Sequence, residues 1–191
     1  MEVQIKELSP ELWQDFEKLF GGNGACGGCW CMSWRIEKHE KWKDIKGDNA
    51  KNRMKEMIAS GKALGLLAYV GDEPVGWCSF DKRTEYSRLD RAPSLKCDDA
   101  HQVWSIPCFF IKRGYRGKSI GTMLMQQALR SIAAHGGKVA EGYPASPLKN
   151  GERTPDAFAW TGTLRMFEKN GFAKADDKCK GKIRMRRTLC D

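Results

Sequence analysis

Apolar positions in the first half of the chain recur with two spacings, which predict alternating strands and helices. Glu2 to Leu8 alternates apolar and polar residues like a strand, and a helix should follow from Ser9 to about Phe20, because a serine, a proline and an acid open it. A second helix is predicted from about Asp48 to Ser60. Two short apolar runs, Ala63 to Val70 and Val75 to Phe80, flank a turn and indicate a hairpin.

One strongly apolar stretch stands in the middle of the chain. Gln102 to Ile111 resembles a central strand, apart from Pro107, which requires a bulge or an unpaired position there. A helix is expected next, closed by Gly136-Gly137, because apolar residues recur every four positions. Those residues are Ile120, Leu124, Ala128 and Ile132.

The last part of the chain is predicted to contain a strand, a short helix and a further strand. Lys138 to Tyr143 is predicted to be a strand and Trp160 to Asn170 a short helix ended by Gly171. The basic tail alternates Ile183 and Met185 with polar residues, as an edge strand would.

Length and composition favour one soluble domain over residues 1–191. With 191 residues and 41% hydrophobic side chains the chain can bury one sizeable core. No stretch approaches the ~20 apolar residues of a membrane span, and the start, Met1 to Lys6, has no basic flank followed by an apolar run. We therefore expect a cytoplasmic protein with no membrane partner, whose eight cysteines are thiols.

The net charge of +9 favours anionic partners in general. Six cations lie in the tail: Lys178, Lys180, Lys182, Arg184, Arg186 and Arg187. A nucleic-acid-binding module is one reading of this pattern. The tail after Phe172 contains no aromatic residue for base stacking, which argues against it.

The segment Arg116 to Thr122 has the composition of an anion-binding loop. It lies between an apolar strand and an amphipathic helix, so it presents unpaired N–H groups and the positive end of a helix dipole. Glycines at 117 and 121 let the backbone approach a phosphate closely. It is not a P-loop, because Lys112 stands where the leading glycine is required, and the dinucleotide fingerprint lacks a third glycine.

This segment resembles the pyrophosphate loop of the GNAT superfamily of N-acetyltransferases, Arg/Gln-x-x-Gly-x-Gly/Ala after a hydrophobic strand. Arg116, Ser119 and Gly121 occupy the three defining positions, with serine where the family usually has glycine. The order of elements and the ending Phe167-Glu168-Lys169-Asn170-Gly171-Phe172 extend the resemblance over most of the chain. The resemblance implies a single-domain α/β fold: a mixed, mostly antiparallel sheet with splayed central strands, flanked by helices.

The resemblance also implies a ligand and its contacts. Acetyl-CoA would be the acyl donor, its pantetheine arm lying between the splayed strands. The backbone of Phe110 and Ile111 would pair with the arm, and Phe167 would also contact the cofactor. The pyrophosphate would bind the loop formed by Arg116, Gly117, Lys118, Ser119, Ile120, Gly121 and Thr122. The acceptor would be a primary amine of a small molecule or peptide, and because dimers are frequent in the family, a homodimer is an expected state.

The candidate proton-transfer groups differ from those usual in the family. The family commonly uses a late-helix tyrosine to protonate the leaving thiolate, and Phe167 stands at that position. Tyr143 is a substitute acid, and Glu141 a candidate base on the same strand face. Ordinary buried or surface roles compete with both assignments. A second alternative is therefore a CoA-binding protein with altered catalysis.

A loop rich in cysteine and tryptophan follows the first predicted helix. Cys26, Cys29 and Cys31 form C-x-x-C-x-C, but there is no second cysteine pair to complete a zinc site, so no metal is predicted. In the family this region shapes the acceptor pocket. The resemblance therefore implies that Trp30, Trp34 and Arg35 contact the substrate. Packing of the loop onto the sheet is an equal alternative.

Overall fold

A seven-stranded sheet runs through a computed structural model of the chain, which describes residues 1–145, 154–155, 158–175 and 182–189. The strand order is β1-β2-β3-β4-β5-β7-β6. The strands are β1 (Gln4–Glu7), β2 (Gly65–Val70), β3 (Glu73–Lys82), β4 (Val103–Ile111), β5 (Val139–Gly142), β6 (Ala173–Lys174) and β7 (Met185–Thr188). All neighbouring pairs are antiparallel except β4 with β5. The expected mixed, mostly antiparallel sheet is thus confirmed.

The sheet opens between β4 and β5. Their parallel pairing extends from Val103 opposite Val139 to Ile106 opposite Gly142, and β4 then continues alone to Ile111. The separation starts beside Pro107. Against β3, Ser79 pairs with Cys108 but Asp81 pairs with Ser105, so Phe80 faces two β4 residues and the strand bulges. The bulge expected from the proline is therefore present, and it turns β4 away from β5.

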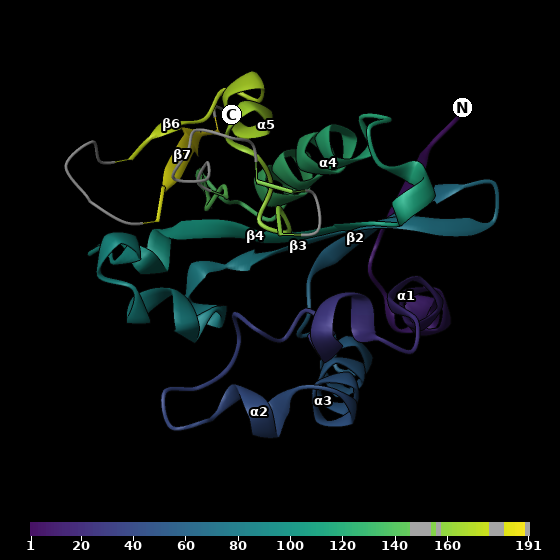
Figure 1. The fold of residues 1–191 in the computed structure, drawn as a ribbon. Helices are drawn as coiled ribbons and strands as arrows, with labels where there is room; N and C mark the ends of the chain where they lie inside the picture. Colours follow the sequence, from purple (N-terminus) through teal and green to yellow (C-terminus); the bar gives the residue numbers. More distant parts are fainter. Residues whose placement is uncertain (146–153, 156–157, 176–181, 190–191) are drawn as a thin grey trace.

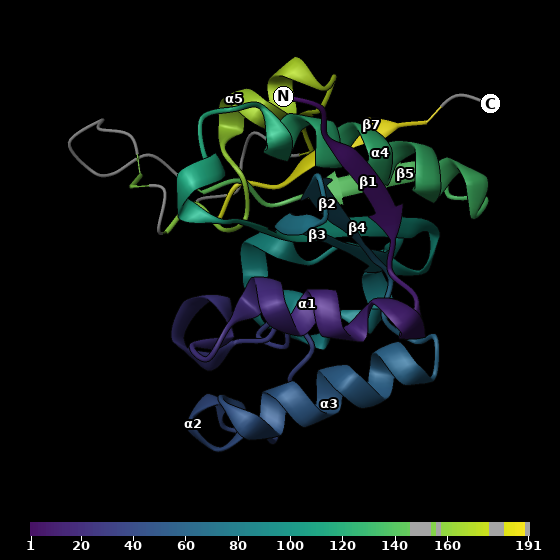
Figure 2. The ribbon, with the colours of Figure 1, turned by 90° about the vertical axis from the view of Figure 1, so that its right-hand side faces the viewer.

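Helices cover both faces of the sheet, as Figures 1 and 2 show. One face carries α1 (Trp13–Phe20), α2 (Trp42–Ile45) and α3 (Asp48–Ala59). The other carries α4 (Ile120–Ala134) and α5 (Leu164–Lys169). Each layer buries its own apolar cluster against the strands, one built around Phe16 and Trp77 and the other around Leu124 and Phe167.

The structure differs from the expected elements in three places. The first predicted helix is split, because Pro10–Leu12 form a 3-10 turn before α1. The late helix begins at Leu164, where the Thr163 side chain caps it by accepting from the Met166 N–H. The tail strand β7 is not an edge strand, because β6 pairs with its outer side. Among the described residues, none of the helices is both long and apolar enough to cross a bilayer.

Candidate functional site

A cleft of about 400 Å³ lies where β4 and β5 separate. Three elements form it: the end of β4, the loop that leads into α4, and the segment from Ala159 to Met166 that crosses the opening. Eight of the ten predicted cofactor residues line it: Phe110, Ile111, Arg116, Gly117, Ser119, Ile120, Gly121 and Thr122. The structure therefore brings most of the predicted loop and strand positions to one surface.

The free edge of β4 presents alternate residues to the cleft. The Phe109 N–H points across the opening and donates to the Trp160 carbonyl at 2.6 Å, and the Ile111 carbonyl accepts from Arg116 Nε at 3.0 Å. Phe110 pairs with Trp77 of β3, so its backbone faces the opposite way. The expected backbone pairing at Phe110 is therefore corrected to Phe109, while Ile111 keeps the orientation it needs.

The start of α4 has the geometry of an anion site. Ser119 adopts a left-handed conformation with φ of 61°, and Gly117 has φ of 74°. The first bond inside the helix runs from the Met123 N–H to the Ser119 carbonyl, so the N–H groups of the three preceding helical residues have no partner within the helix. This left-handed position explains why glycine is usual where serine stands here.

The two cations of the loop are arranged differently. Arg116 lines the cleft and is held there by its bond to Ile111. Lys118 is exposed, and its ammonium lies over the Tyr115 ring, 5.3 Å from the centroid. Lys118 is not part of the cleft wall, so the structure supports a direct electrostatic contact from Arg116 only.

Phe167 does not reach the cleft, which corrects its predicted cofactor contact. Its side chain is fully buried and packs edge-on against Phe109 and Phe172. The space it fills exists because Gly142 has no side chain: a Cβ there would lie 1.9 Å from the Phe167 ring. Met166, one residue earlier on α5, faces the cleft in its place.

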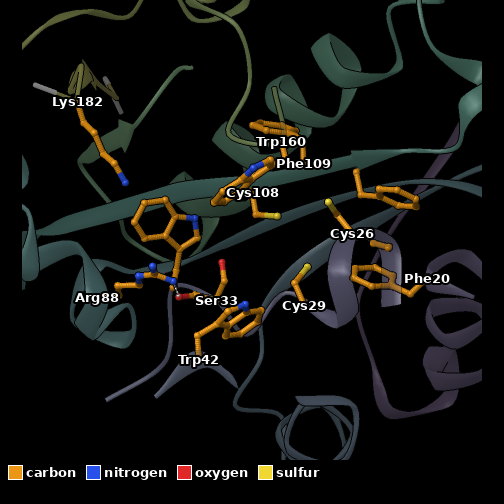
Figure 3. A pocket seen from close by; sticks show the side chains of 13 residues that line it. Phe20, Cys26, Cys29, Ser33, Trp42, Arg88, Cys108, Phe109, Trp160 and Lys182 are labelled. Atoms are coloured by element: carbon orange, nitrogen blue, oxygen red, sulfur yellow. Dashed lines mark hydrogen bonds between the residues drawn. The ribbon is translucent and has the colours of Figure 1, made fainter. Parts of the chain in front are cut away.

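A second cavity, of about 280 Å³, adjoins the cleft (Figure 3). Six of its thirteen lining residues are aromatic, namely Phe20, Trp34, Trp42, Phe109, Phe110 and Trp160. Five residues line both spaces, namely Ala25, Cys26, Phe109, Phe110 and Trp160. A molecule in the cavity and the end of an extended molecule in the cleft would therefore meet at this shared wall.

Only one of the three predicted acceptor contacts lines this cavity. Trp34 does, and its indole is fixed by a 3.1 Å bond to the Pro107 carbonyl at the bulge. Trp30 is buried against Phe20, with ring centroids 5.7 Å apart, and lines a groove on the other side of the loop. Arg35 is buried in a 2.8 Å ion pair with Asp81. The predicted contacts of Trp30 and Arg35 with the acceptor are thus corrected.

Glu141 and Tyr143 lie behind the cavity rather than in its wall. The Glu141 carboxylate is fully buried and accepts from Tyr143 at 2.8 Å, from Arg83 at 3.3 Å and from Arg186 at 2.6 Å. Burial raises the pKa of Tyr143 well above its usual value, and the neighbouring carboxylate adds to the effect. The Tyr143 ring packs 6.1 Å from Trp34, so this network supports a residue of the cavity wall.

The cysteine loop contributes thiols to the cavity. Cys26 and Cys29 line the cavity with Cys108, whereas Cys31 is buried behind them. A hydrogen bond from Cys108 outweighs burial and lowers the pKa of Cys31 to about 7, aided by the Trp77 indole N–H 3.2 Å away. Within the described ranges, no three His, Cys, Asp or Glu side chains are placed to share a metal ion.

Several site residues had no signal in the sequence. Arg88, Cys108, Trp160 and Lys182 come from segments far apart in the chain and meet only in the fold.

The open sheet and the helix N-terminus at its wide end define an α/β protein suited to an extended ligand with an anionic group. The chain belongs to the acetyltransferase (GNAT) family, whose sequence model matches residues 27–141. No curated protein sequence matches the chain at a significant level.

Solved structures with the same fold are distant in sequence. PaiA N-acetyltransferase from Thermoplasma acidophilum, in complex with coenzyme A, is 15% identical with a TM-score of 0.51, over 99% of this chain and 100% of that one. YncA from Salmonella typhimurium, a putative acetyltransferase solved with acetyl-CoA, is 11% identical with a TM-score of 0.58, over 99% and 95%. An N-acetyltransferase from Staphylococcus aureus is 10% identical with a TM-score of 0.59, over 98% and 99%. Coenzyme A or acetyl-CoA in the first two is consistent with the expected donor.

Proposed function

We propose that the protein is an N-acetyltransferase that moves an acetyl group from acetyl-CoA to a primary amine held in the aromatic cavity. The observation that carries this proposal is the shared wall of the two spaces. A thioester at the inner end of the cleft and an amine in the cavity would both contact Phe109, Phe110 and Trp160. That contact permits direct attack within one ternary complex.

The donor contacts follow from the cleft. The N–H groups at the start of α4 and the Arg116 guanidinium would hold the pyrophosphate. The backbone of Phe109 and Ile111 would pair with the pantetheine arm once the Phe109 N–H exchanges its bond to Trp160.

The reaction needs two proton movements. The neutral amine attacks the thioester carbon, the carbon–sulfur bond breaks, and the attacking nitrogen loses a proton to water while the departing thiolate gains one. Cys26 is the titratable side chain in the shared wall. Because Cys26 is exposed to solvent, water at this position can carry both protons. In this proposal Glu141 and Tyr143 position the cavity wall and do not exchange protons with substrate.

Calorimetry with acetyl-CoA, CoA and a single-stranded oligonucleotide at moderate salt tests the proposal. We expect binding of both CoA compounds and none of the oligonucleotide. Absence of CoA binding would overturn the function, and oligonucleotide binding alone would favour the nucleic-acid module. CoA binding without thiol release across a panel of amines would favour the catalytically altered alternative.

A further inference from the structure

The charged side chains that line the aromatic cavity are all cations. Arg88 and Lys182 contribute them, and no Asp or Glu lies in the described part of the wall. Figure 3 shows both at one end of the cavity, with Cys26 and Phe20 at the other. An acceptor amine is itself a cation before it reacts, so the cavity has the wrong charge for a polyamine or other polycation.

Three other buried or half-buried arginines are paired with carboxylates, whereas Arg116 and Arg187 bond to backbone carbonyls. Arg35 pairs with Asp81, Arg83 with Asp90 and Glu141, and Arg186 with Asp99. Arg88 bonds instead to a neutral group, the Ser33 carbonyl, at 3.1 Å. Among the ion pairs of the described residues, neither Arg88 nor Lys182 has a carboxylate partner.

Each of the two cations also lies near another cation that raises its electrostatic cost. Burial, and then Arg91, lower the pKa of Arg88, while burial, and then Arg88, lower the pKa of Lys182. Like charges gathered without a counter-ion favour binding of an anion, because it relieves their repulsion.

The geometry of Lys182 directs this charge into the cavity. Its ammonium lies over the Trp34 ring, 4.7 Å from the centroid, and the Trp34 ring packs 5.7 Å from the Trp160 ring in the same wall. Apart from Ser33 and three cysteine thiols, the rest of the wall is aromatic or apolar, and the cavity volume lies just below the roughly 300–1,000 Å³ typical of small-molecule sites.

We propose that the acceptor is a small amino acid-like amine, with a carboxylate held by Lys182 and Arg88 and an apolar body held by the tryptophan-lined wall. The proposal rests on the proposed function and names its substrate class. The carboxylate would sit at the cation end, which leaves the amine free to point toward the shared wall with the cleft.

Paired acceptors with and without the carboxylate test the proposal. We would measure product by mass spectrometry with saturating acetyl-CoA, comparing phenylalanine with phenylalaninamide and leucine with leucinamide. Because an amide lowers the pKa of the neighbouring amine, each kcat/KM is referred to the concentration of neutral amine. On that basis the expected kcat/KM is about tenfold or more higher for the carboxylate of each pair, as for one or two charge-assisted contacts. Lys182→Gln should remove most of this preference through KM, and Lys182→Glu should reverse it. Lys138→Gln, an exposed lysine far along the chain, is the matched control and should leave it unchanged.

A binding measurement separates this proposal from the catalytic one. N-acetylphenylalanine should quench tryptophan fluorescence at about tenfold lower concentration than N-acetylphenylalaninamide, with or without CoA present. Equal binding, or faster transfer to the amides or to spermidine, would overturn the carboxylate assignment and leave the acetyltransferase intact. Tighter binding of the carboxylate without transfer to any amine would support the anion site and overturn the proposed reaction.

Discussion

The Tyr143 hydroxyl lies 2.8 Å from a Glu141 carboxylate oxygen and 2.7 Å from the Ser105 hydroxyl, entirely inside the protein. This placement distinguishes a positioning tyrosine from a catalytic one. Tyr143→Phe should lower the free energy of unfolding by about 1–3 kcal/mol, because it leaves a buried carboxylate with one donor fewer. Urea denaturation measures that loss.

The same variant tests the role in turnover. For the folded variant kcat should stay within a few-fold of the parent, whereas loss of a general acid costs about 100-fold or more. A fall of that size, with stability unchanged, would restore Tyr143 as the acid.

The Arg35–Asp81 pair makes a second prediction. Both side chains are nearly inaccessible, at 3% and 7% exposure, so Arg35→Met would leave a buried carboxylate without its counter-ion. We expect a loss of about 3–5 kcal/mol in unfolding free energy. Arg53→Met, which breaks a more exposed pair with Glu40, should cost under about 1 kcal/mol. If Arg35→Met instead raised the acceptor KM and kept its stability, the substrate-contact role would be correct after all.

The α4 loop makes a third prediction. A Cβ at Gly121 would meet only Met166 Sδ, at 3.4 Å, so Gly121→Val should fold while its branches enter the cleft. We expect the Kd for CoA to rise at least about tenfold, equivalent to about 1.4 kcal/mol. Ser119→Gly is the matched control, since it relieves a left-handed serine and should leave CoA affinity intact while raising stability by up to about 1 kcal/mol. Unchanged affinity in Gly121→Val would show that the pyrophosphate binds elsewhere.

Cys31 should titrate near neutrality. Its pKa in the folded protein is about 7, below the ordinary thiol value of about 8.5. Ionisation of this thiol therefore stabilises the fold. The contribution is fully present above about pH 8.5 and is lost as the pH falls through about 7. The free energy of unfolding should therefore increase between pH 7 and about 8.5, and ultraviolet thiolate absorbance should show one group titrating near 7. Cys31→Ser should abolish both effects and Cys26→Ser neither. Persistence of the near-neutral titration in Cys31→Ser would assign it to another thiol.

Local signals in the sequence were enough to predict the β4 bulge and the start of α4. Pro107 lacks the N–H that a regular strand pairing needs, and the small residues before Ile120 allow the backbone turn that begins the helix. The residue roles that were predicted incorrectly depend on partners distant in the chain. Arg35 meets a carboxylate 46 positions away, and Glu141 meets Arg83 58 positions away, so neither pairing is visible in a local pattern.

The late helix shows a second kind of limit. Phe167 and Met166 are adjacent, and the rotation of α5 about its axis decides which of them faces the cleft. Gly142 fixes that rotation, because the absence of a side chain there leaves room for the Phe167 ring. One residue of offset on a helix turns a side chain by about 100° and moves it from ligand to core.

The bond between Phe109 and Trp160 also affects how the molecule behaves in a crowded solution. Beyond Pro107, β4 has a bare edge in the middle of a sheet, and a bare edge can recruit strands from other molecules. The Trp160 carbonyl accepts from the Phe109 N–H, and the Arg116 guanidinium donates to the Ile111 carbonyl, so two of the hydrogen-bonding groups along this edge are already occupied. Fewer groups are left for intermolecular β-pairing, which lowers the risk of self-association in a protein whose central sheet stays open.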